Sequence, residues 1–272
     1  MEEALFEVYQ SPQFQNPSLI VGWHNHDAGK LSSRVIDFLN EKLGSRKIAE
    51  IKPSGFFTLG GADFRGNLVQ VPESKFWGCE KGNLLIFKSE EPEYEWFRFL
   101  NAVLDFAQHR CQVKELYTVS GTVSLIAHTS PRRLLAVYNQ PEFQQTLRGY
   151  ELYDMAWEGP PAISSYLLWA AERRDIPGVS LWPEIPFYLA AGEDPLAAKL
   201  TLSFLDMRFD LGLDLGEFDL EIRGQNEKVA QLRRESAEIN EYINRLESGL
   251  GLNEEEQTKL AREVYEVFER RG

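Results

Sequence analysis

The chain has little of what marks secreted or membrane-spanning proteins. It contains only two cysteines in 272 residues, Cys79 and Cys111, and neither lies in a CxxC pair or beside histidines at metal-ligand spacing. A disulfide framework is therefore not expected. No run approaches the roughly 20 apolar residues that a membrane-spanning helix needs. The acidic first residues lack the basic and apolar regions of a signal peptide, so we expect a cytoplasmic protein.

Positive charge is also scarce. The chain carries 29 Lys and Arg against 42 Asp and Glu, a formal net charge of −13 at pH 7. Sequence-independent nucleic-acid binding needs a basic surface that displaces counterions, and an anionic membrane surface attracts the same kind of patch. We therefore expect neither nucleic acid nor membrane as a partner.

The common catalytic motifs are missing as well. No serine lies in a GxSxG elbow. The loop from Gly22 to Lys30 resembles a phosphate-binding loop only loosely, because six residues separate Gly22 from Gly29 and Leu31 follows the lysine. No cofactor is predicted, and an enzyme is the less favoured reading.

The composition and the hydrophobic pattern of the chain predict a layered α/β domain. Hydrophobic residues make up 43% and aromatic residues 12% of the chain, which is ample for a large core. Short apolar runs alternate with stripes at helical spacing, and this alternation predicts a mainly parallel central sheet flanked by helices. The predicted strands are 18–23, 47–51, 84–88, 116–120, 134–138 and 178–182. The predicted helices are 31–43, 94–109, 163–174 and 194–209.

Composition changes near residue 212, so we divide the chain into an α/β core, 1–212, and a C-terminal helical extension, 213–272. The extension is rich in Glu, Arg, Asn and Gln and carries apolar residues at near-heptad spacing up to Leu246. A second stripe follows the glycines at 249 and 251. Two helices joined by a glycine-containing loop predict an antiparallel hairpin, whose narrow seam suits packing within the chain or against a neighbouring subunit.

The loop after the strand 18–23 holds the first group of candidate site residues. A glycine-bearing turn from strand to helix can direct backbone amides at an anion, although a purely structural turn explains it too. Two histidines and a carboxylate form at most a partial metal site, because the chain has only two other histidines, and no metal is predicted. Asp27 also suits the helix N-cap. The candidates in this loop are Gly22, His24, His26, Asp27 and Gly29.

A second group surrounds two glutamates that follow tryptophans. Glu158 comes after Trp157 and before Gly159 and Pro160, while Glu184 follows Trp182 by two residues. The two carboxylates can act as acid and base if the fold brings them together. The alternative is that they cap helix termini or bind partner amides.

Several motifs between residues 22 and 197, in their order along the chain, resemble those of the proteasome assembly chaperone family in its prokaryotic form. The resemblance spans about residues 18–210, and Gly22-Trp23 with Asp27-Ala28-Gly29 also fits the family's first strand and helix. Its most specific part is formed by Trp157-Glu158-Gly159-Pro160, Ser180-Leu181-Trp182-Pro183-Glu184, Pro186-Phe187-Tyr188 and Asp194-Pro195-Leu196-Ala197.

The resemblance implies a fold like that of purine nucleoside phosphorylases and assembly into oligomers, and it adds Tyr188 to the candidate residues. Some archaeal members dock on proteasomes through a C-terminal hydrophobic-Tyr-any tripeptide. This sequence ends Glu269-Arg270-Arg271-Gly272, so we do not expect docking by that route.

Two hypotheses follow. The first is a homo-oligomeric scaffold or assembly factor, a trimer being one candidate, that engages a protein client through its C-terminal helices. The second is a small-molecule enzyme or sensor with a pocket at the C-terminal end of the strand 18–23, where open α/β sheets bind ligands.

Overall fold

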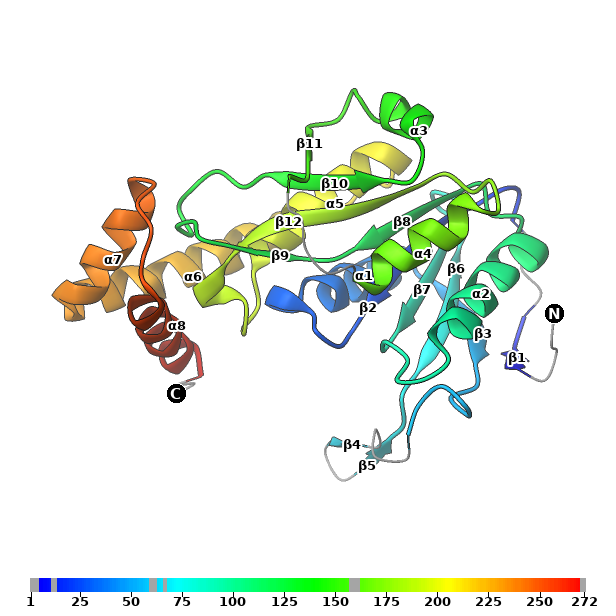
Figure 1. Cartoon of the computed structure of the whole chain (residues 1–272), viewed down its shortest axis with the longest axis horizontal. Helices are drawn as coiled ribbons and strands as arrows, with labels where there is room; N and C mark the ends of the chain where they lie inside the picture. The colour runs from blue at the N-terminus through cyan, green and yellow to red at the C-terminus, as the bar shows by residue number, and fades with distance from the viewer. Residues whose placement is uncertain (1–4, 11–13, 59–62, 66–67, 157–161, 270–272) are drawn as a thin grey trace.

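The computed structural model describes residues 5–10, 14–58, 63–65, 68–156 and 162–269. In these residues one ten-stranded sheet has the order β1-β3-β6-β7-β2-β8-β12-β10-β11, with β9 beside β12 (Figure 1). β4 and β5 form a separate hairpin. The strands are β1 (Phe6–Val8), β2 (Ser18–Trp23), β3 (Arg46–Ile51), β4 (Asp63–Arg65), β5 (Leu68–Gln70), β6 (Ser74–Cys79), β7 (Leu84–Ser89), β8 (Glu115–Val119), β9 (Thr122–Ser124), β10 (Leu134–Tyr138), β11 (Leu152–Asp154) and β12 (Gly178–Pro186).

The sheet is mixed, and the prediction of a mainly parallel sheet was wrong. The central strands β7, β2, β8 and β12 are parallel, whereas β1, β3 and β6 form antiparallel pairs at one side and β10 pairs antiparallel with β12 at the other. The missed strand β6 explains much of the difference. Only residues 80–83 join β6 to β7, and Gly82 there has φ +73°. Such a turn joins antiparallel neighbours, because a parallel connection needs a crossover of a dozen or more residues.

Two hydrophobic cores lie on opposite faces of the sheet, and β2 contributes to both. Its six residues are all buried, with Ile20 in one core and Leu19 and Val21 in the other. On one face pack α1 (Leu31–Lys42) and α5 (Pro195–Phe209), and on the other α2 (Trp96–Asp105) and α4 (Ile163–Glu172). This arrangement confirms the predicted central sheet flanked by helices. The remaining helices of the core are the 3-10 turns η2 (Ala28–Lys30) and η5 (Phe187–Leu189), the π-helical η4 (Phe106–Arg110) and α3 (Pro141–Thr146).

Local sequence signals set the ends of the core helices. The Asp27 carboxylate accepts hydrogen bonds from the amides of Ser32 and Ser33 at 2.8 Å each, so it satisfies the first turn of α1 as predicted, although Lys30 holds the N-cap position. Asp194 caps α5 and accepts from the Leu196 and Ala197 amides at 3.1 Å. These bonds pair amides that a helix N-terminus otherwise leaves without partners.

The C-terminal residues form three helices, so the predicted hairpin of two is not confirmed. They are α6 (Gly216–Glu235), α7 (Ala237–Glu247) and α8 (Glu254–Glu269), grouped at the end of the molecule away from the N-terminus (Figure 1). The predicted first helix breaks at Ser236, whose backbone is extended and whose hydroxyl accepts from the Ile239 amide. Apolar residues of all three helices join the core on the α1 and α5 face, so the predicted seam packs within the chain.

Candidate functional site

A cavity of about 120 Å³ opens at the carboxyl ends of the parallel strands; we call it the strand-end cavity. Its lining comes from the loops after β7, β2 and β8, from Trp182 of β12 and from the first residues of α4. Open α/β sheets place ligands at this edge because loops and helix N-termini from several strands converge there. The cavity lies at the end of the strand 18–23, where the sequence predicted a pocket.

Three of the predicted residues, His26, Asp27 and Trp182, line the strand-end cavity. Gly22 has a packing role instead. A Cβ at Gly22 would approach the Ile36 side chain within 2.5 Å, so the glycine lets α1 lie close to β2. Gly29 occupies a turn with φ +65°, a conformation that favours glycine. Neither glycine lines the cavity.

The other histidine of this loop takes part in the sheet through its backbone. The amide of His24 donates to the Ser89 carbonyl at 3.0 Å and so extends the pairing of β2 with β7. Trp157, Glu158, Gly159 and Pro160 lie outside the described residues.

Two carboxylates give the strand-end cavity an acidic side. Burial raises the pKa of Asp27 above its ordinary value, while the amides of Ser32 and Ser33 oppose this shift. Burial also raises the pKa of Glu91, and His26, 3.7 Å away, opposes it. Both acids lie on the β2 and β7 side of the cavity. Sequence reasoning missed Glu91, because only the strand order brings it beside the loop after β2.

Three residues of the cavity lining carry a buried polar side-chain atom that has no hydrogen-bond partner in the described part of the chain. They are the indole nitrogens of Trp23 and Trp182 and the hydroxyl of Ser32. Trp23 and Ser32 are only 3% and 2% exposed. Buried polar groups in native proteins nearly always have a partner, from the protein, from water or from a ligand. The three atoms are themselves buried, so they lie within the wall of the cavity and are not exposed to it.

Glu184 is committed to an ion pair and does not act as a free acid. Both of its carboxylate oxygens accept from the Arg133 guanidinium, at 2.6 and 2.9 Å, and these bonds lower the pKa of Glu184. The neighbouring Arg132 donates to the Glu184 carbonyl at 2.7 Å and to the Asp194 carboxylate at 2.9 Å. These contacts tie the residues before β10 to β12 and to the start of α5, which is a structural role.

Tyr188 lies at the junction of the core with the C-terminal helices. Its hydroxyl oxygen accepts from the His128 amide at 2.6 Å and is also hydrogen-bonded to the His128 Nδ1, 2.9 Å away. Burial lowers the pKa of His128 to about 4, which keeps the imidazole neutral at pH 7. Thr129, next to this histidine, donates to Glu247 of α7 at 2.9 Å.

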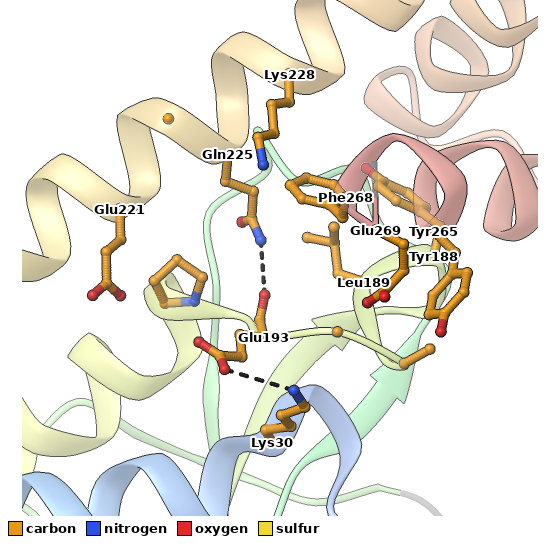
Figure 2. Close-up of a pocket in the computed structure, with 14 residues that line it drawn as sticks. Lys30, Tyr188, Leu189, Glu193, Glu221, Gln225, Lys228, Tyr265, Phe268 and Glu269 are labelled. Carbon is orange, nitrogen blue, oxygen red and sulfur yellow. Dashed lines mark hydrogen bonds and ion pairs between the residues drawn. The ribbon is translucent and has the colours of Figure 1, made fainter. Parts of the chain in front are cut away.

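A second cavity, of about 320 Å³, separates η5 and the start of α5 from α6 and α8 (Figure 2). Figure 2 shows Tyr265 and Phe268 of α8 opposite Leu189, with Gln225 above Glu193. Gln225 donates to the Glu193 carbonyl at 2.8 Å, and the Glu193 carboxylate lies 3.7 Å from Lys30.

A partly exposed cluster of aromatic side chains lies on α2 and α4; we call Trp96, Phe97, Tyr166 and Trp169 the aromatic face, of which Trp96 and Tyr166 are half-buried. The Phe97 ring lies 5.9 Å from that of Tyr166 and 6.1 Å from that of Trp169, measured between centroids. The Arg173 guanidinium stacks 4.5 Å from the Trp169 ring centroid. Phe97 is 56% and Trp169 46% exposed. Exposed, clustered large apolar side chains of this kind mark interaction surfaces.

The described residues contain no group of three or more His, Cys, Asp or Glu side chains placed to hold a metal ion. Among the described helices, none is both long and apolar enough to span a bilayer.

The sequence matches the PAC2 family over residues 19–246. The chain belongs to the PAC2 family. The match confirms the resemblance to proteasome assembly chaperones found in the sequence, and it extends beyond residue 210 through α6 and most of α7. No curated protein matches the chain.

Solved structures share the fold of this PAC2 family protein at low identity. A protein of unknown function from Corynebacterium glutamicum is 21% identical, with a TM-score of 0.78 and coverage of 91% of this chain and 97% of that one. A proteasome-assembly chaperone homologue from Mycobacterium tuberculosis is 17% identical, with a TM-score of 0.71 over 83% and 99% of the two chains. An archaeal proteasome activator from Pyrococcus furiosus is 22% identical, with a TM-score of 0.71 over 84% and 98%.

Proposed function

We propose that this PAC2 family protein is a homo-oligomeric assembly factor whose copies associate through the aromatic face. The observation that carries the proposal is the exposed aromatic cluster on α2 and α4, with Arg173 stacked on Trp169. Tryptophan, tyrosine and arginine dominate the energetic centres of protein interfaces. We also propose that residues 1–212 form a core domain and residues 213–272 an extension. We further propose that the fold is similar to that of nucleoside phosphorylases.

The charges around the aromatic face favour a second copy of the chain as its occupant. α2 and α4 run in the same direction, since Phe97 neighbours Tyr166 near their starts and Asp105 pairs with Arg174 near their ends. Glu95 lies at the starting end with the exposed Arg98, while Arg173 lies at the other end with the exposed Glu172. A two-fold axis perpendicular to the two helices would place Glu95 of one copy near Arg173 of the other, and a symmetric dimer requires such self-complementary pairs.

The role as an assembly factor is supported by the family match and by relatives named as a proteasome-assembly chaperone homologue and a proteasome activator. A proteasome subunit is therefore the client class that we propose. The helices α6–α8, predicted to engage a client, give less support, because their apolar stripe is buried against their own core.

Sedimentation equilibrium of the full chain tests the self-association. We expect the wild-type protein to associate, and Trp169→Ala with Phe97→Ala to weaken association about tenfold or more. Leu220→Ala on α6 is the matched control, because Leu220 is also exposed but lies outside the aromatic face. A wild-type monomer at all concentrations, or equal effects of the control and the double variant, would contradict this part of the proposal.

Native mass spectrometry of gently purified protein tests the client class. A proteasome subunit bound at a defined ratio would support the assembly role. Free oligomers, together with no binding of purified proteasome subunits, would overturn that role and leave the self-association standing.

A further inference from the structure

The second cavity, between the core and the C-terminal helices, has apolar side chains near its centre and carboxylates around them. It measures about 320 Å³ and is bounded by η5 and the residues before α5 on the core side and by α6 and α8 on the other. Figure 2 shows Leu189 and Phe268 in the middle, with the carboxylates of Glu221 and Glu269 on opposite sides. Clefts of about 300–1,000 Å³ that combine apolar walls with a few polar groups are common sites for small molecules.

One buried side chain presents an unused acceptor to this cavity. Gln225 of α6 is only 9% exposed. Its amide nitrogen donates to the Glu193 carbonyl at 2.8 Å, but its Oε1 accepts no hydrogen bond from any described residue. Unlike the indole nitrogens of Trp23 and Trp182, this oxygen is accessible, and it faces the cavity that Gln225 lines. Because buried acceptors normally have a donor from the protein, from water or from a ligand, the cavity favours an occupant that donates hydrogen bonds.

The charges of the lining favour a cation as that donor. The lining carries three carboxylates and two ammonium groups, those of Glu193, Glu221, Glu269, Lys30 and Lys228. Glu221 pairs with Arg34 at 2.7 Å, and Glu193 lies 3.7 Å from Lys30 in a pair whose side chains are both more than half exposed. Such exposed pairs are weak. Glu269 makes no ion pair with a described residue. A bound cation therefore gains a carboxylate that has no counter-charge.

The aromatic rings of α8 suit the same kind of occupant. The Lys228 ammonium lies 5.1 Å from the centroid of the Phe268 ring, so this ring already attracts a cation. Tyr265, which is 48% exposed, presents a second ring three residues earlier on α8 (Figure 2). Methylene groups pack against such rings, and ammonium groups are attracted to their faces. An aliphatic chain that carries ammonium groups combines both properties.

We propose that this cavity binds a linear aliphatic diamine or polyamine. One ammonium group lies against Glu269, another donates to the Gln225 Oε1 on the Glu221 side, and the methylene groups cover Leu189 and Phe268. A neutral chain would leave Glu269 without a counter-charge, and a monoamine would satisfy only one end. The C-terminal helices extend the core on the α1 and α5 face of the sheet, whereas the aromatic face lies on the α2 and α4 side, so the site does not depend on the proposed self-association.

Isothermal titration calorimetry of the full chain tests this site with 1,4-diaminobutane and spermidine as probes. Butylamine supplies one ammonium group alone, and 1,4-butanediol supplies a chain without charge. We expect one molecule of diamine or polyamine per chain, bound at least about tenfold more tightly than butylamine or the diol. Magnesium chloride that displaces the amine at equal concentration would show only general attraction to an acidic protein and overturn the proposal. Absence of binding with both amines would overturn it too.

A substitution that fills the cavity tests where the amine binds. A Cβ at Gly224 of α6 meets nothing within 4 Å, so a larger side chain enters the cavity without a clash. Leucine also favours a helix more than glycine does, so the fold is retained. We expect Gly224→Leu to abolish binding. Gly224→Ala is the matched control, because one methyl group leaves most of the cavity open. Equal affinity in the wild-type protein and in Gly224→Leu would place the amine elsewhere and contradict the proposal.

Charge variants test the orientation of the ligand. Glu269→Gln is expected to weaken binding about fivefold, and Glu227→Gln, exposed on α6 outside the lining, is the control that keeps wild-type affinity. Lys228→Gln removes the ammonium beside Phe268 and is expected to strengthen binding. The Trp169→Ala, Phe97→Ala variant is expected to bind normally, which separates failure of this site from failure of the self-association. Unchanged affinity in both Glu269→Gln and Lys228→Gln would contradict a cation site.

Discussion

At the scale of single residues, a buried ion pair connects the residues before β10 with β12 and α5. The Arg132 and Asp194 side chains are 2% and 0% exposed and pair at 2.9 Å. Asp194 also caps α5, so one carboxylate joins the residues before β10 to a helix on the other side of β12. Asp194 followed by Pro195 is a pattern typical of a helix N-terminus. It could not predict the arginine, because the pair joins positions 62 residues apart.

Removing the arginine tests this pair. Arg132→Met leaves the Asp194 carboxylate buried without its counter-charge, and we expect a loss of about 3–5 kcal/mol in the free energy of unfolding. Lys30→Ala breaks the exposed pair with Glu193 and is expected to cost less than about 1 kcal/mol. Urea denaturation of both variants gives the comparison, and similar losses in the two would show that burial of the Arg132 pair is unimportant.

The neutral imidazole of His128 predicts a loss of stability in acid. Its pKa of about 4 in the folded protein lies below the ordinary value of 6.5, so the unfolded chain binds more protons between these pH values. Stability is therefore fully present above pH 6.5 and falls as the pH drops toward 4, by about 3 kcal/mol from this residue. Thermal unfolding from pH 7.5 to 4.5 should show a smaller decrease in His128→Gln than in the wild-type protein. Parallel curves would show that His128 does not cause the acid sensitivity.

At the scale of helices and strands, the elements that bury a continuous apolar surface were predictable. β2 and β10 have the predicted bounds, because runs such as Ser18–Trp23 are buried on both faces. β6 was missed because Lys75 and Gly78 leave only Phe76 and Trp77 as a continuous apolar run. The strands β1, β9 and β11 have only three residues each, too few for any pattern. Because β1 and β6 were missed, the antiparallel pairs on the β3 side of the sheet were missed too.

The break between α6 and α7 was not predicted, because the near-heptad stripe continues through it. Ser236 lies at this break and accepts from the Ile239 amide at 3.3 Å. Ser236→Ala removes this cap and is expected to destabilise the protein by about 1 kcal/mol. Chemical denaturation measures the loss, with Ser248→Ala at the opposite end of α7 as the control. A stabilised variant would show that the chain favours one continuous helix.

Only the part of the candidate site that follows β2 was predictable from the sequence. The loop after β2 was placed at the sheet edge correctly, and His26 and Asp27 do line a cavity. Glu91, Ser120 and Ser164 come from other elements, and their approach depends on the order of β7, β2 and β8, which the sequence pattern does not specify.

At the scale of the whole molecule, the family match and the surface point to the same kind of function. The PAC2 family match includes the core and two of the three C-terminal helices, whose apolar residues extend the core on one face. The other face carries the exposed aromatic cluster of α2 and α4. The net charge of −13 opposes the approach of two copies at long range, so association needs local complementarity at this face and should strengthen as salt screens the remaining charge.

The most direct test of the account is a charge-reversal cycle across the proposed two-fold axis, read by sedimentation equilibrium at low salt. Glu95→Arg places like charges together at both ends of the aromatic face, and so does Arg173→Glu. We predict that each single variant weakens self-association, and that the double variant recovers most of the wild-type affinity because the opposite charges meet again. Additive losses in the double variant, or no change in any of the three, would contradict a symmetric interface at the aromatic face.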